Sequence, residues 1–89
     1  MQRYPSFELA LGAEIAAARE EKGLSQRALS ARLKRRINYI QRIEAGRQPV
    51  TASGLAEIGL ALGTKGSDLL ARAEEAAGNA IRLPKVSKT

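Results

Sequence analysis

The sequence predicts an all-α fold, a single small domain built from five short helices. Ala, Leu, Glu, Arg and Lys dominate the composition, and residues that favour strands are scarce. Apolar residues recur at intervals of three and four, and most of these stretches end at a glycine, as helices commonly do. A chain of 89 residues has room for one domain with a modest aliphatic core.

The first three helices are expected over residues 7–22, 26–33 and 37–45. Ser6 and Ser25 are the expected N-caps of the first two, because a serine oxygen accepts from free amides of the first turn. The inward positions are Phe7, Leu11, Ile15 and Ala18 in the first helix, Ala28, Leu29 and Leu33 in the second, and Ile40 and Ile43 in the third.

The last two helices are expected over residues 52–62 and 68–77, the latter behind a Ser67 cap. Their apolar positions are Leu55, Ile58 and Leu62, followed by Leu69, Leu70 and Ala73. Residues 1–78 are therefore interpreted as the domain, and residues 79–89 as a tail that is mobile or associated with a dimer.

The positive charge is concentrated in one segment. Residues 27–47 contain seven cations and one acid, a net charge of +6, whereas the eight cations and eight acids elsewhere cancel. A concentrated basic segment is typical of a protein that binds a polyanion. A solvated basic face that only aids solubility is the alternative.

Three motifs follow one another at fixed spacing: Gly-Leu-Ser-Gln at 23–26, Tyr-Ile-x-x-Ile-Glu-x-Gly at 39–46, and Ala-Leu-Gly at 61–63. In this order they resemble the Xre, or Cro and lambdoid-repressor, type of helix-turn-helix domain over about residues 11–70. The resemblance implies a compact five-helix lambda-repressor-like fold whose third helix enters the major groove of double-stranded DNA.

The resemblance also implies roles for individual residues. A partly buried ion pair is expected between Arg19 and Glu44. Asparagine can pair with adenine through two hydrogen bonds, and arginine with guanine. The expected base contacts are Arg36, Ile37, Asn38, Gln41 and Arg42, and the expected phosphate contacts are Gln26, Arg27, Arg35, Tyr39 and Arg47.

The link between the second and third helices departs from the family pattern of Gly, apolar residue, then Ser or Thr. Lys34 stands where a positive φ is often needed, and Arg35 stands where an apolar residue is usual. Arg36 cannot accept a hydrogen bond as a helix cap. A start of the third helix one or two residues later, with Asn38 as the N-cap, is therefore an alternative prediction. Ile37 suits a thymine methyl or a protein surface.

Two functions remain open at this point. The first is a transcriptional regulator, a repressor that binds a two-fold symmetric operator as a homodimer. Its dimer surface is assigned to Leu69, Leu70, Ala73, Ile81 and Leu83, with a plain core role as the alternative for Leu69 and Leu70. The second is a protein-interaction module on the same fold, an antiactivator or antitoxin, which Ile37, the irregular turn and the apolar residues Ile81, Leu83 and Val86 favour.

Composition argues against other classes of function. Without Cys or His the chain lacks the usual thiolate and imidazole metal ligands, and no metal, cofactor or small-molecule substrate is expected. Its paired acids are neighbours in helices, so they point in different directions, and an enzyme is not expected. No signal peptide or membrane span is evident, and the expected location is the cytoplasm.

Overall fold

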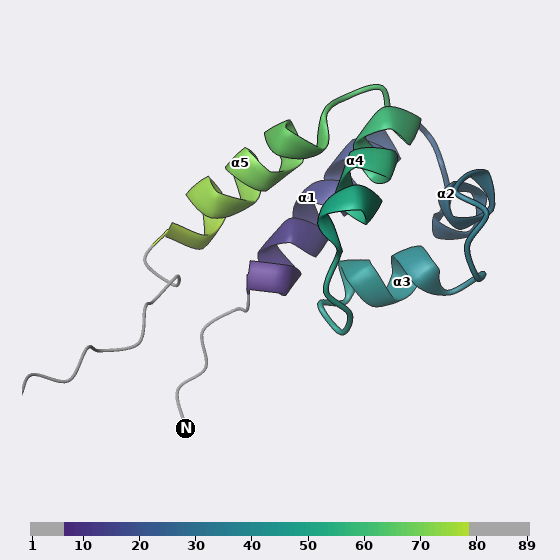
Figure 1. The fold of residues 1–89 in the computed structure, drawn as a ribbon, viewed down its shortest axis with the longest axis horizontal. Coiled ribbons are helices and arrows are strands. Elements are labelled where there is room, and N and C mark those ends of the chain that lie inside the picture. The colour runs from purple at the N-terminus through teal and green to yellow at the C-terminus, as the bar shows by residue number, and fades with distance from the viewer. Residues whose placement is uncertain (1–6, 79–89) are drawn as a thin grey trace, which may run out of the picture.

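The computed structural model describes residues 7–78, in which five helices and no strand occur. The helices are α1 (Phe7–Glu21), α2 (Gln26–Arg32), α3 (Tyr39–Glu44), α4 (Ala52–Ala61) and α5 (Gly66–Ala77). Helix α1 packs against α5 and α3, α4 against α5, and α2 against α3. Figure 1 shows α2 and α3 together at the end of the molecule farthest from α5. The all-α class predicted from composition is confirmed.

The core is aliphatic and draws on every helix. Six large apolar side chains are almost completely buried: Ile15, Leu29, Ile40, Ile43, Ile58 and Leu69. Each buried side chain of this size contributes about 1.5–3 kcal/mol relative to an exposed one. In α2 the prediction was wrong at Ala28, which is exposed, whereas the neighbouring Ser30 is fully buried. The inward face of α2 therefore carries a hydroxyl group.

Gly12 lets the end of α3 lie directly on α1. A Cβ atom at this position would come within 2.8 Å of the Cα of Glu44, and it would also collide with the carbonyl oxygen of Ile43. Both contacts are with backbone, which cannot move aside cheaply. The absence of a side chain at Gly12 thus allows the close approach of α1 and α3 that places Glu44 against α1.

Helix α3 begins at the later start that the sequence left open, and helix α5 begins earlier than predicted. Helix α3 starts at Tyr39, two residues late, with Asn38 at the N-cap position but without a side-chain cap bond. Helix α5 starts early, at Gly66, and its N-cap is Lys65 and not Ser67. The early start places Gly66 against α4, where a Cβ atom would come within 2.8 Å of the carbonyl oxygen of Leu55.

Two expectations lie outside the described residues: the Ser6 cap and the tail at 79–89. None of the helices within residues 7–78 is long and apolar enough to cross a membrane.

Candidate nucleic-acid interface

The turn between α2 and α3 is closed by a left-handed residue. Lys34 has a φ of 56°, as the family pattern required, although it is not glycine. The amide of Lys34 donates to the carbonyl of Ala31 at 3.0 Å, and the amide of Arg35 donates to the carbonyl of Ser30 at 2.9 Å. These two bonds form a Schellman motif, which ends a helix and reverses the chain.

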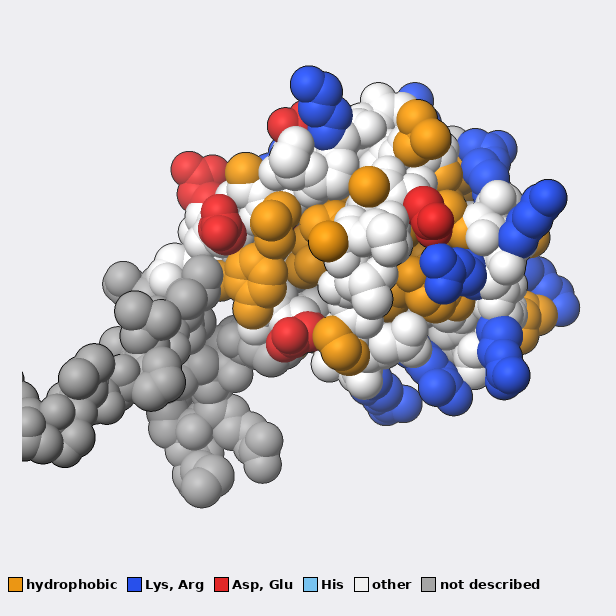
Figure 2. Space-filling view, viewed as in Figure 1, with side chains coloured by type: hydrophobic (Ala, Val, Ile, Leu, Met, Phe, Trp, Pro, Cys, Tyr) orange, Lys and Arg blue, Asp and Glu red, His pale blue; other side chains and the backbone are white. Residues whose placement is uncertain are grey.

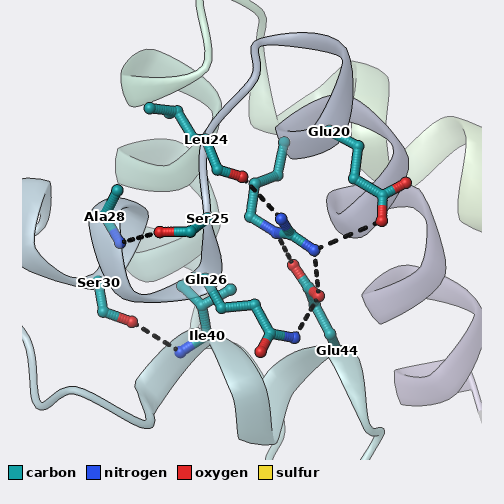
Figure 3. Close-up of polar contacts among 9 residues, drawn as sticks. Glu20, Leu24, Ser25, Gln26, Ala28, Ser30, Ile40 and Glu44 are labelled. Atoms are coloured by element: carbon teal, nitrogen blue, oxygen red, sulfur yellow. Dashed lines mark hydrogen bonds and ion pairs between the residues drawn. The ribbon is translucent and has the colours of Figure 1, made fainter.

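The first turn of α3 receives its cap from α2. The Ser30 hydroxyl accepts a hydrogen bond from the amide of Ile40 at 3.1 Å, and the side chain of Ser30 is fully buried. Figure 3 shows this bond joining the two helices. An amide in the first turn of a helix has no partner within the helix, so it needs an acceptor from elsewhere. The Ser30 hydroxyl supplies one, whereas the Asn38 side chain at the N-cap position makes no cap bond.

The ion pair expected between Arg19 and Glu44 is present. Arg19 Nε donates to Glu44 Oε2 at 2.6 Å and Arg19 Nη2 donates to Oε1 at 3.0 Å, a two-bond fork. The side chains are only 10% and 7% exposed. Arg19 Nη1 also donates to the carbonyl of Leu24 at 2.7 Å. One guanidinium therefore joins α1, the segment before α2 and the end of α3.

Hydrogen bonding to Glu44 raises the pKa of Arg19 above its ordinary value, against the opposing effect of burial. A raised pKa on a cation means that its contribution to stability is fully present through neutral pH. This contribution is lost only when the pH rises through the pKa of the folded state, in strongly alkaline solution.

Gln26, an expected phosphate contact, also takes part in this network. Its Nε2 donates to Glu44 Oε1 at 2.8 Å, and Figure 3 shows its amide turned toward the Glu44 carboxylate. The side chain is half-buried at the first residue of α2. Ser25 caps the same helix, with its Oγ accepting from the amide of Ala28 at 3.0 Å, as predicted.

Arg35 is held by two contacts. Its Nη2 lies 2.9 Å from Glu57 Oε1 in α4, and its guanidinium carbon lies 4.9 Å from the centre of the Tyr39 ring. The Arg35 and Glu57 side chains are 41% and 52% exposed, so water screens this pair. Arg35 thus keeps its charged head at the surface, although it stands where an apolar residue is usual.

The chain around α3 forms two neighbouring hollows. The first, of about 280 Å³, is lined by Arg35, Arg36, Asn38, Tyr39, Arg42 and Gln48. The second, of about 310 Å³, is lined by Asn38, Gln41, Arg42, Ala45 and Arg47. Asn38 and Arg42 line both. Most residues that were expected to contact bases or phosphates are thus brought together on one face.

Three of the expected contact residues lie outside these hollows. Ile37 is 57% exposed and precedes α3. Gln26 and Arg27 begin α2, where Arg27 is exposed.

The predicted dimer surface was wrong for two of its residues. Leu69 and Ala73 are completely buried in the core of the single chain, so they are not available to a second copy. The five-helix domain needs both side chains to fill the space between α5 and its neighbours. Leu70 is half-buried at the surface, and Ile81 and Leu83 lie outside the described residues.

Sequence reasoning missed three residues that shape this region: Ser30, Gln48 and Glu57. Ser30 and Glu57 have their partners in other elements, and Gln48 joins the first hollow only through the fold, so local patterns do not identify them. The available signal was weak: Glu57 is the only charged residue in α4, and Gln48 follows Arg47 in the basic link.

Two short helices joined by a tight turn, with the second exposed among arginines, are how many proteins present a helix to the major groove. Figure 2 shows Lys and Arg side chains gathered at the end of the molecule that carries α2 and α3. The fold and the site therefore define a helix-turn-helix DNA-binding domain. Residues 10–73 match the model of the helix-turn-helix domain family, and the chain belongs to that family.

Two solved structures are similar to this chain, both crystal structures of the clp gene regulator ClgR from Corynebacterium glutamicum. The first is 31% identical, with a TM-score of 0.78, covering 84% of this chain and 80% of the other. The second is 29% identical, with a TM-score of 0.80, covering 88% of this chain and all of the other. No curated protein matches the sequence significantly.

Proposed function

We propose that the chain is a transcriptional regulator, a repressor that binds double-stranded DNA as a homodimer on a two-fold symmetric operator. The observation that carries this proposal is the pair of arginine-lined hollows on either side of Asn38 and Arg42. Among the described residues, neither Arg36 nor Arg42 has an ion-pair partner within the chain. Guanidinium groups left free in this way suit DNA phosphates and guanine edges.

The proposed roles divide by position. The side chains of Arg36, Ile37, Asn38, Gln41 and Arg42 would face the major groove and read bases. Gln26, Arg27, Arg35, Tyr39 and Arg47 would contact phosphates, and the first hollow adds Gln48 to this group. The Gln26 amide can bind Glu44 and a phosphate together, because its second N–H stays available after the first is donated to Glu44.

A homodimer suits this proposal because a single domain reads few base pairs and a two-fold axis doubles the site. With Leu69 and Ala73 in the core, the proposed dimer surface reduces to Leu70 together with Ile81 and Leu83. Leu70 also lines an apolar hollow of about 540 Å³, together with Leu55 and Ala56 among others. We propose that the protein acts in the cytoplasm, and DNA binding of this kind needs no cofactor and no catalytic step.

Selection of bound DNA from a random pool tests this proposal. The expected result is a two-fold symmetric consensus whose half-sites lie about 10 base pairs apart, or a multiple of that spacing. Recovery of no enriched sequence would contradict sequence-specific binding. An enriched but asymmetric sequence would contradict the dimer while leaving DNA reading in place.

A second candidate is a protein-interaction module, an antiactivator or antitoxin on the same fold. It is favoured by two exposed apolar side chains, Leu60 at 81% and Ile37 at 57%. Gel shifts with genomic fragments separate the two functions. Saturable binding that resists competitor DNA supports the regulator, and its absence together with capture of one defined protein partner supports the module.

A further inference from the structure

Arg35 differs from the other two arginines that line the first hollow, Arg36 and Arg42. It alone has an acidic partner, Glu57 of α4 at 2.9 Å. It also lies over the ring of Tyr39, 4.9 Å from its centre. Contacts with Glu57 in α4 and Tyr39 in α3 thus define the position of the Arg35 guanidinium.

The contact with Glu57 leaves Arg35 available to a ligand. Glu57 does not line the first hollow, whereas Arg35 and Tyr39 do. The carboxylate therefore holds Arg35 from outside the hollow. The hydrogen bond from Arg35 to Glu57 uses Nη2. A guanidinium has five N–H donors in a rigid fork, so most of them stay free for the oxygens of a phosphate.

We propose that Glu57 is a positioning residue for DNA binding, which holds Arg35 at the wall of the first hollow where a backbone phosphate binds. This inference rests on the proposed function. The proposal predicts that removing Glu57 weakens DNA binding, which is the opposite of the effect expected from charge alone. Removing an acid near DNA should strengthen binding through charge alone, whereas loss of a positioned arginine weakens it, because a free arginine side chain must be ordered upon binding.

Three variants separate charge from position: Glu57→Ala, Glu57→Gln and Arg35→Ala. Binding is measured by fluorescence anisotropy with a labelled duplex of mixed sequence, about 20 base pairs long, at about 50 mM salt. Glu57→Ala is expected to weaken binding about two- to five-fold, the range of an exposed ion pair. Glu57→Gln is expected to bind at least as tightly as the unmodified chain, because its amide oxygen still accepts from Arg35 Nη2.

Two controls make the result specific. Glu75→Ala changes the net charge equally on the exposed face of α5, and it is expected not to weaken binding. In an Arg35→Ala background, Glu57→Ala is expected to cause no further loss. Melting temperatures of all variants are compared to exclude unfolding.

The inference is overturned if Glu57→Ala binds as tightly as the unmodified chain, or if it weakens binding equally when Arg35 is already absent. It is also overturned if Arg35→Ala leaves the affinity unchanged. Failure of the proposed function has a different signature, because the unmodified chain would then either not bind the duplex or enrich no sequence from a random pool.

Discussion

At the scale of single residues, Lys34 and Ser30 determine how the turn before α3 closes. The positive φ of Lys34 could be predicted, because the matched pattern places a left-handed residue there. The cap from Ser30 could not, because its hydrogen-bond partner is ten positions away and depends on how α2 and α3 pack. Local sequence thus defines the turn, while tertiary structure supplies the cap.

Replacing Lys34 with glycine should stabilise the domain. A side chain in the left-handed region costs about 1–2 kcal/mol, and the greater freedom of glycine when unfolded cancels part of the gain. We expect Lys34→Gly to raise the free energy of unfolding by about 1 kcal/mol in urea denaturation. Lys34→Ala is the matched control, because it removes the same charge but keeps the Cβ atom. Equal free energies of unfolding for Lys34→Gly and Lys34→Ala would contradict backbone strain at this position.

Replacing Ser30 with alanine should destabilise the domain. The buried amide of Ile40 then loses its acceptor, which costs about 1–2 kcal/mol. For a domain of this size we expect the melting temperature to fall by about 4–16 °C. Ser67→Ala, at an exposed position in α5, controls for the loss of a hydroxyl group. The cap assigned to Ser30 is refuted if both variants melt together.

At the scale of elements, the order and number of the helices could be predicted from apolar spacing and glycines. The start of α5 could not, and the start of α3 at Tyr39 was only one of the alternatives that the sequence left open. Helix α3 takes its acceptor from Ser30, and Gly66 of α5 lies against the backbone of α4. Both starts depend on packing contacts between one helix and the next, which the spacing of apolar residues does not reveal. The pairing of Arg19 with Glu44 was predicted through the family resemblance and not from helical spacing.

Arg19→Ala should destabilise the domain more than Arg27→Ala. The first substitution leaves the Glu44 carboxylate, 7% exposed, without its cation, and such a loss typically costs about 3–5 kcal/mol. The second removes an exposed side chain at the start of α2 and should have little effect. Thermal denaturation followed by circular dichroism compares them. Equal melting temperatures would contradict the structural role of the pair.

At the scale of the whole molecule, the charge is strongly asymmetric. The net charge of +6 within residues 27–47 lies on α2, α3 and the links around them, and the rest of the chain is neutral in sum. The basic face could be predicted from this distribution alone. The place of Gln48 in the first hollow and the contact between Arg35 and Glu57 could not be predicted in this way. Both depend on how α4 and the link before it lie beside α3.

The central claim is that DNA binds the face formed by α3 and its flanking segments. Backbone amide chemical shifts, recorded by NMR while a duplex is added, test it most directly. We expect the largest changes at Gln26, Arg27 and residues 35–48, with the exposed Glu74 and Glu75 of α5 unaffected. Changes centred on α1 or α5, or no change at low salt, would contradict the claim.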